Sequence, residues 1–220
     1  MAVVFMMTAI VIPDLAHAQR KILNIGHKEP ETMDPYTTLL GFNQSIVRLV
    51  YRGLVRFKIT PDNKVTTAEV EPDMAESWAM NDDGTVWTFK LRKGVKWHKG
   101  FGDFTAEDVK FSIERVQDRN LQGNKFAKNL EIIKEVKVLD DYTVQMTLTN
   151  FDPVFLLGLV GYQQGYIVSK KAVTQYGDDY AWNSVGTGPF YFDRHMPREK
   201  VVLKAHRDYY FGRPPIDEVH

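Results

Sequence analysis

The chain has 220 residues, with 28 Lys and Arg against 28 Asp and Glu, so its formal net charge is zero. A balanced charge gives no support for nucleic acid or an anionic membrane surface as a partner, and we expect no nucleic acid. The hydrophobic content of 44% and the charged content of 25% are typical of a soluble globular protein with one large domain or two small ones.

Residues 1–18 have the pattern of a signal peptide. Residues 2–12 carry no charge, and Ala16 and Ala18 stand in the A-x-A arrangement that precedes a cleavage site. The apolar run is too short to span a bilayer; a buried terminal strand or helix is the alternative. A lipoprotein needs a cysteine at its cleavage site, and the sequence has none. We therefore predict an exported, soluble, periplasmic protein that is not a lipoprotein and begins at Gln19.

The first third of the mature chain predicts two strands around one helix. Residues 21–26 and 54–57 are apolar-rich and read as strands. Apolar residues between them recur at the spacing of one helix face, at Phe42, Ile46, Leu49 and Val50. Residues 71–78 read as a short helical turn after Pro72.

The middle of the chain predicts a sheet and a capped helix. In residues 86–91 the bulky side chains alternate, which directs Trp87, Phe89 and Leu91 to a core. Thr105 and Asp108 have the spacing of a capping box at the start of a helix. Residues 133–148 alternate on both sides of an Asp140-Asp141 turn, which is typical of a β-hairpin.

The last third predicts two helices and then a pair of strands. We expect an apolar helix over residues 153–160, a short strand over 165–169, and a helix over 170–176 that Gly177 ends. The segment GTGPFYF, residues 186–192, leads into a strand, and residues 200–206 pair with it. This mixture of strands and helices indicates an α/β or α+β protein.

Motifs for catalysis and metal binding are absent from the sequence. It contains no H-E-x-x-H, paired Cys-x-x-Cys, EF-hand, G-x-S-x-G, Walker A or G-x-G-x-x-G pattern. The histidines are scattered, and each is expected to be a surface or capped residue. The acidic pairs at residues 82–83 and 140–141 lie in predicted turns, where Asp bonds locally. We therefore predict no catalytic residue, no metal and no cofactor.

An ordered set of motifs resembles one protein family. Residues 71–116 read EPDMAESWAMNDDGTVWTFKLRKGVKWHKGFGDFTAEDVKFSIERV, preceded by MDPY at 33–36 and VYRGLV at 50–55. GTGPFYF at 186–192 and RDYYFGRPPIDEV at 207–219 follow. The chain from Gln19 to His220 thereby resembles the family 5 extracellular solute-binding proteins of peptide- and nickel-type ABC importers.

The resemblance implies a two-lobed periplasmic-binding-protein-like fold. This chain would form its N-terminal lobe, of mixed α/β and α+β structure with an inserted accessory subdomain, and the second lobe would be absent. Residues 19–60 would begin lobe I, residues 61–184 would form the accessory subdomain, and residues 185–220 would return to lobe I. Because members of the family are more than twice as long, we expect an N-terminal fragment that binds solute weakly or not at all.

The resemblance also implies three groups of ligand-contacting residues. Loops after strands line the cleft of open α/β sheets, and a carboxylate after the first strand would meet a ligand amine, with solvated charges as the alternative. The second group precedes the strand at 165–169. The third lies at the glycines of GTGPF, where a tight strand entry without ligand contact is equally open. The residues are Glu29, Pro30 and Glu31; Tyr162, Gln163 and Gln164; and Gly186, Thr187 and Gly188.

The function that the resemblance implies is that of the periplasmic solute-binding component of an ABC importer. It would be a monomer that binds a di- or oligopeptide without chemistry and delivers it to the permease subunits in the inner membrane. A nickel complex, haem, an opine or an oligosaccharide is an alternative solute. An exported hydrolase and a non-functional truncated remnant stay open as alternative functions.

Overall fold

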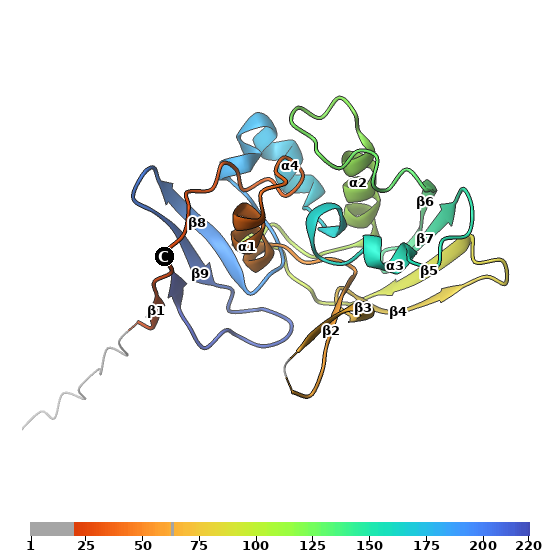
Figure 1. Cartoon of the computed structure of the whole chain (residues 1–220), viewed down its shortest axis with the longest axis horizontal. Helices are drawn as coiled ribbons and strands as arrows, with labels where there is room; N and C mark the ends of the chain where they lie inside the picture. The colour runs from red at the N-terminus through yellow and green to blue at the C-terminus, as the bar shows by residue number, and fades with distance from the viewer. Residues whose placement is uncertain (1–19, 63) are drawn as a thin grey trace, which may run out of the picture.

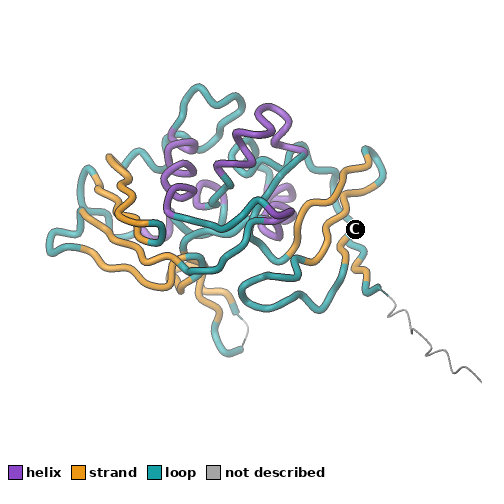
Figure 2. Tube along the Cα trace, turned by 180° about the vertical axis from the view of Figure 1, so that it is seen from behind, coloured by secondary structure: helices purple, strands orange, loops and turns teal. Residues whose placement is uncertain are grey.

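The computed structural model describes residues 20–62 and 64–220. The predicted signal peptide, residues 1–18, lies outside the described residues. Among the helices that are described, none is both long and apolar enough to cross a membrane. The polypeptide forms mixed helices and strands, with strands at the two ends of the molecule and most of the helices between them (Figure 2).

One four-stranded sheet joins the two ends of the described chain. It contains β1 (Ile22–Leu23), β8 (Phe190–Met196), β9 (Lys200–Ala205) and β10 (Glu218–Val219), in the order β1-β10-β9-β8. β1 is parallel to β10, and the other pairs are antiparallel. Helix α1 (Gly41–Val50) contacts β8 beside this sheet (Figure 1). The predicted helix and the strands predicted over residues 186–192 and 200–206 are confirmed, whereas the strand predicted over 21–26 is shortened to β1.

A second four-stranded sheet lies at the opposite end of the molecule (Figure 1). Its strands β4 (Ala75–Met80), β5 (Val86–Leu91), β6 (Ile133–Asp140) and β7 (Thr143–Leu148) are all antiparallel, in the order β4-β5-β7-β6. The side chains predicted to face the core from β5 are buried. The predicted hairpin forms, with its turn one residue later than expected, at residues 141–142.

Helix α2 (Ala106–Gln117) packs on the β6–β7 side of this sheet. Its predicted capping box is confirmed: the backbone N–H of Thr105 donates to Asp108 Oδ2 at 3.1 Å. A carboxylate at this position satisfies an N–H that the helix itself leaves unpaired. Strands β2 (Val55–Ile59) and β3 (Val65–Pro72) form a separate two-stranded hairpin, which comes between α1 and β4 in the sequence.

Three further predicted elements differ from the structure. Residues 71–78 form no helical turn: β3 ends at Pro72 and β4 starts at Ala75, because this segment pairs with β2 and β5. The apolar helix expected over 153–160 is shortened to α3 (Phe155–Gly158). The strand expected over 165–169 is reduced to a single bridge between Tyr166 and Gly53.

The connections after α3 are short helical segments. The 3₁₀ turn η2 (Gln163–Gly165) precedes α4 (Lys170–Tyr176), which ends as predicted at Gly177, where φ is +51°. Two further 3₁₀ turns are η1 (His98–Gly100) and η3 (Gly177–Trp182). A positive φ suits glycine because it has no Cβ to clash.

Candidate solute-binding site

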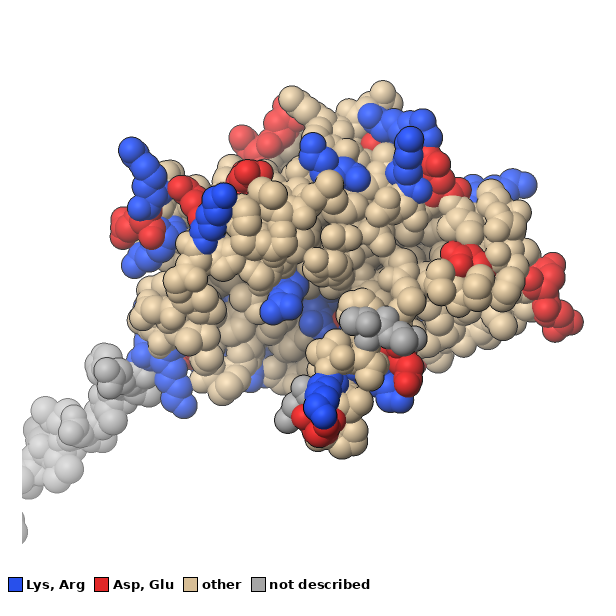
Figure 3. Space-filling model, in the orientation of Figure 1, with Lys and Arg blue, Asp and Glu red and all other residues tan. Residues whose placement is uncertain are grey.

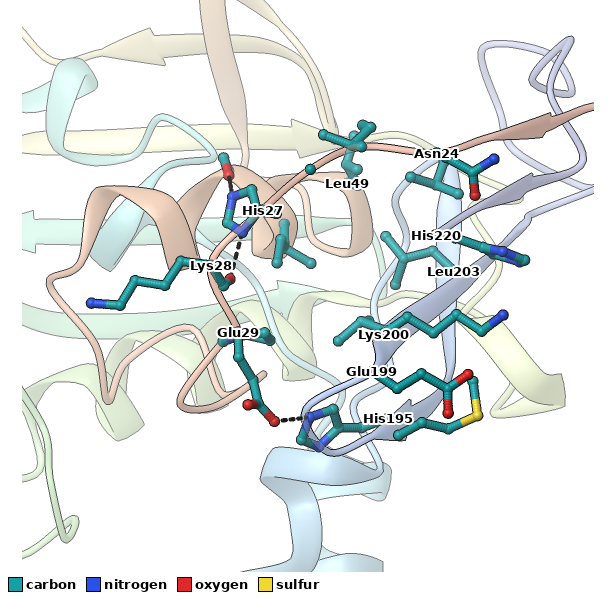
Figure 4. A pocket seen from close by; sticks show the side chains of 18 of the residues that line it. Asn24, His27, Lys28, Glu29, Leu49, His195, Glu199, Lys200, Leu203 and His220 are labelled. Carbon is teal, nitrogen blue, oxygen red and sulfur yellow. Dashed lines mark hydrogen bonds and ion pairs between the residues drawn. The ribbon is translucent and has the colours of Figure 1, made fainter.

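A pocket of about 900 Å³ lies between residues 24–30, helix α1 and the β8–β9 hairpin (Figure 4). Its apolar lining comes from all three of these parts and from β10: Ile25, Ile46, Leu49, Val201, Leu203 and Val219. Polar side chains of the loop and the hairpin stand around these residues. On the face of the molecule seen in Figure 3, acidic and basic side chains are interspersed, with no large area of one sign.

Glu29 lines this pocket, and its carboxylate is already engaged within the chain. Oε1 accepts a hydrogen bond from His195 Nε2 at 2.8 Å and another from the Arg198 backbone N–H at 3.1 Å. The two side chains face each other across the gap between loop and hairpin (Figure 4). These bonds, first that from Arg198, lower the pKa of the Glu29 carboxyl. The imidazole of His195 also stacks on Trp182, with ring centroids 4.3 Å apart.

The next two predicted residues differ in exposure. Pro30 is buried and lines the pocket, whereas Glu31 does not line it. The side chain of Glu31 is exposed and forms no ion pair with any residue in the described ranges 20–62 and 64–220. Its backbone N–H is held by a buried side chain of α1, Asn43, at 2.8 Å. An exposed side chain also fits the alternative of a solvated charge, and contact of residues 29–31 with a solute stays a prediction.

The second predicted group does not line this pocket. Tyr162 is 39% exposed, and Gln163 has a positive φ of 51°. Gln164 accepts a hydrogen bond from the Asn129 amide at 3.1 Å. Contact between these residues and a solute stays a prediction.

The third predicted group is buried against the end of α1. A Cβ added to Gly186 would lie 2.0 Å from the Val50 carbonyl oxygen, and the Gly188 N–H donates to that same oxygen at 2.8 Å. The side chain of Thr187 is fully buried, and its hydroxyl donates to Met74 Sδ at 3.3 Å. The glycines thus serve a close approach of two backbones. A solute contact by this group stays a prediction.

Two histidines, His98 and His206, also form hydrogen bonds with the backbone of residues 186–188. His98 Nδ1 accepts from the Gly186 N–H at 3.2 Å, and its Nε2–H donates to the Gly188 carbonyl at 2.9 Å. His206 Nδ1 bonds the same carbonyl at 3.2 Å, and the two rings meet edge to face. Burial lowers the pKa of His98 to about 3 and also lowers that of His206. A surface location, one of the two expectations for the histidines, is therefore wrong for His98 and His206, which are both buried and hydrogen-bonded.

The sequence did not reveal His195 or Asn43 as partners of the predicted site. His195 lies 166 residues from Glu29, and no local pattern connects them. Asn43 carried a weak signal, because asparagine in the first turn of a helix is placed to bond a nearby backbone group. Among the residues that the structure describes, no group of three or more His, Cys, Asp or Glu side chains could hold a metal ion.

Comparisons with known proteins identify the same family that the sequence motifs resemble. The profile of the family described as "Bacterial extracellular solute-binding proteins, family 5 Middle" matches residues 69–220. Heme-binding protein A of Haemophilus influenzae is 37% identical over 82% of this chain and 37% of its own length. The Dipeptide-binding protein of Escherichia coli is 34% identical over 86% of this chain and 38% of its own length.

Two solved structures share the fold. MoaA of A. tumefaciens in complex with mannopinic acid has a TM-score of 0.84 and 34% identity, over 91% of this chain and 40% of that one. DppA of Helicobacter pylori in complex with the peptide STSA has a TM-score of 0.77 and 31% identity, over 91% and 42%. The chain therefore spans 37–42% of the length of these four proteins. It belongs to the family 5 bacterial extracellular solute-binding proteins.

Proposed function

We propose that this chain is part of the solute-binding component of an ABC importer in the periplasm. It takes part in binding a small solute without covalent chemistry, and it contributes to delivery of that solute to permease subunits in the inner membrane. The match of the family profile to residues 69–220 carries this proposal. Because one of the four proteins compared is named for dipeptides and another holds a peptide, we propose a di- or oligopeptide as the solute; heme and mannopinic acid, named for the other two, stay alternatives.

We propose residues 24–32, named here the solute loop, as the part of the described chain that meets the solute. The loop follows β1, where ligands bind in open α/β sheets, and its residues 24–30 line the pocket that Glu31 adjoins in sequence. Glu31 offers an exposed carboxylate to the ammonium group of a peptide, whereas the Glu29 carboxylate is engaged by His195. We propose the other two predicted groups, residues 162–164 and 186–188, as secondary contacts.

We also propose the division of the chain that the sequence predicts. Residues 19–60 and 185–220 would form one unit, and residues 61–184 would form an inserted subdomain. The pairing of β1 with β10 supports this division, as does the β4–β7 sheet, whose strands all lie between residues 75 and 148. Cleavage after Ala18, a monomeric state and the absence of catalytic activity belong to the same proposal.

The function is tested by titrating residues 19–220, labelled with ¹⁵N, with trialanine at millimolar concentration. We expect weak binding, because the chain matches less than half of the length of its relatives. Amide resonances of the solute loop should shift, and the midpoint of thermal unfolding should rise, since a ligand of the native state stabilises it. No response to trialanine or to any of a panel of di- and tripeptides would contradict the proposal.

Two controls identify the contact with the ammonium group. N-acetyl-trialanine keeps the peptide body but carries no ammonium, and the Glu31→Gln variant keeps the shape of the side chain but carries no charge. Each should weaken the response, and combining them should weaken it no further, because both remove the same interaction. Equal responses to trialanine and its acetylated form would remove Glu31 from the site.

A further inference from the structure

We propose that Asn43 is the positioning residue of the solute loop, an inference that rests on the proposed function. Asn43 lies in the first turn of α1, and its side chain is fully buried. Its Oδ1 accepts a hydrogen bond from the Glu31 N–H at 2.8 Å, and its Nδ2 donates to the Thr32 carbonyl at 2.7 Å. A single side-chain amide thus fixes the backbone at two consecutive residues of the loop.

An asparagine suits this role because the backbone presents one donor and one acceptor. The amide supplies the matching acceptor and donor at once, and the two partners together determine which way the amide is oriented. Aspartate would keep the acceptor for Glu31 but would face the Thr32 carbonyl with a second acceptor. Alanine would leave both backbone groups without this partner, and a buried group that loses its partner is costly.

The two bonds to Asn43 are more sheltered than the contacts that His27 and Glu29 make. His27 also reaches α1, through Ser45 at 2.7 Å, and Glu29 reaches the hairpin through His195, but both of these contacts are exposed. Hydrogen bonds count for more where water does not compete for the partners. Asn43 therefore anchors the backbone of residues 31–32 from α1, beside a buried Pro30, while the Glu31 side chain stays exposed.

Gln44 provides a matched control on the same helix. Its side chain is 1% exposed, and its Nε2 donates to the Thr38 carbonyl at 3.0 Å, outside the solute loop. Truncating Gln44 to alanine also removes a buried amide from α1. It leaves both bonds to the solute loop in place, so that any general loss of stability can be separated from a loss of positioning.

The experiment measures amide hydrogen exchange of Glu31 in the folded chain, for residues 19–220 of the natural sequence and three variants. We expect exchange at least about fivefold faster in Asn43→Ala than in Gln44→Ala, as the loss of one hydrogen bond of about 1 kcal/mol predicts. Asn43→Asp, which keeps the acceptor and serves if the alanine variant does not fold, should leave the Glu31 amide protected. Equal exchange in Asn43→Ala and Gln44→Ala, or a deprotected Glu31 amide in Asn43→Asp, overturns the inference.

A second readout separates positioning from a purely structural role. The trialanine dissociation constant, taken from the resonances of the solute loop, should rise at least about fivefold in Asn43→Ala and stay unchanged in Gln44→Ala. Faster exchange with an unchanged dissociation constant would overturn the positioning role. If trialanine shifts no resonance of the natural sequence, the proposed function fails for this solute, and the exchange rates alone decide whether Asn43 holds the loop.

Discussion

Lowering the pH from 7 to 5 is expected to destabilise the fold through one buried side chain, His98. Its ring is 1% exposed, with Nδ1 accepting from the Gly186 N–H and Nε2–H donating to the Gly188 carbonyl. The bond from Gly186 needs the neutral ring, because protonation would direct a second N–H at that amide, whereas the bond to the Gly188 carbonyl forms in either state. Burial lowers the pKa of His98 to about 3, with a smaller lowering from the charges of His206 and Lys99.

The direction of the effect follows from linkage between proton binding and folding. The unfolded chain binds a proton at His98 below about pH 6.5, whereas the folded chain does not until about pH 3. The contribution of the neutral His98 ring to stability is therefore fully present above pH 6.5 and is lost as the pH falls from 6.5 to about 3. Since one pKa unit corresponds to about 1.4 kcal/mol, the loss is about 2 kcal/mol at pH 5 and about 5 kcal/mol below pH 3.

Urea unfolding at pH 7 and pH 5, followed by tryptophan fluorescence, measures this loss. His98→Gln keeps one acceptor and one donor but does not titrate, so the natural sequence should lose about 2 kcal/mol more than the variant between the two pH values. His206→Gln reports the second buried histidine separately. Equal losses in the natural sequence and His98→Gln refute the reasoning. An NMR titration that finds the His98 ring protonated at pH 5 in the folded chain would refute it as well.

Three further substitutions or titrations test contacts elsewhere in the fold. Gly186→Ala should lower the free energy of unfolding by more than about 2 kcal/mol, because its Cβ would lie 2.0 Å from a carbonyl oxygen of α1. In the control Gly26→Ala the added Cβ meets nothing within 4 Å, so equal midpoints of thermal unfolding for the two variants would contradict this. Arg115→Met should lower the free energy of unfolding in urea by about 3–5 kcal/mol, because the Asp34 carboxylate would be left buried without its ion-pair partner. Adding Asp34→Asn removes that charge and should restore most of the lost stability. The Glu29 carboxyl should titrate below pH 4.5 by ¹³C NMR, and titration at 4.5 would show that its hydrogen bonds do not form in solution.

The elements that the sequence predicted well depend on neighbours in the chain. Alternation along β5 placed Trp87 and Phe89 in the core, and the spacing from Thr105 to Asp108 located the start of α2. In both cases the physical cause acts within one strand or one helical turn. The wrong prediction at residues 71–78 has the opposite cause, because its composition suits a helical turn but pairing with β2 and β5 imposes extended backbone.

Long-range contacts set the rest of the fold and most of the candidate site. β1 is only two residues long, and its partner β10 lies almost two hundred residues further along the chain. The hydrogen bond from His195 to Glu29 spans a similar distance. No periodicity encodes such pairings, because they depend on how the two sheets and α1 come together.

Glu29 and Glu31 illustrate why environment, more than residue type, decides which carboxylate can serve a solute. Both follow β1, and the sequence predicts the same role for each. In the fold, one oxygen of Glu29 receives two donors from the β8–β9 hairpin, so a solute ammonium would have to compete with bonds that already stabilise the ionised form. Glu31 has its backbone held by Asn43 while its side chain is exposed, so it can bind a cation without breaking an internal bond. A fixed backbone also lowers the entropy that the loop loses on binding. The proposed contribution of Glu31 to affinity therefore rests on an exposed carboxylate that forms no ion pair among the described residues.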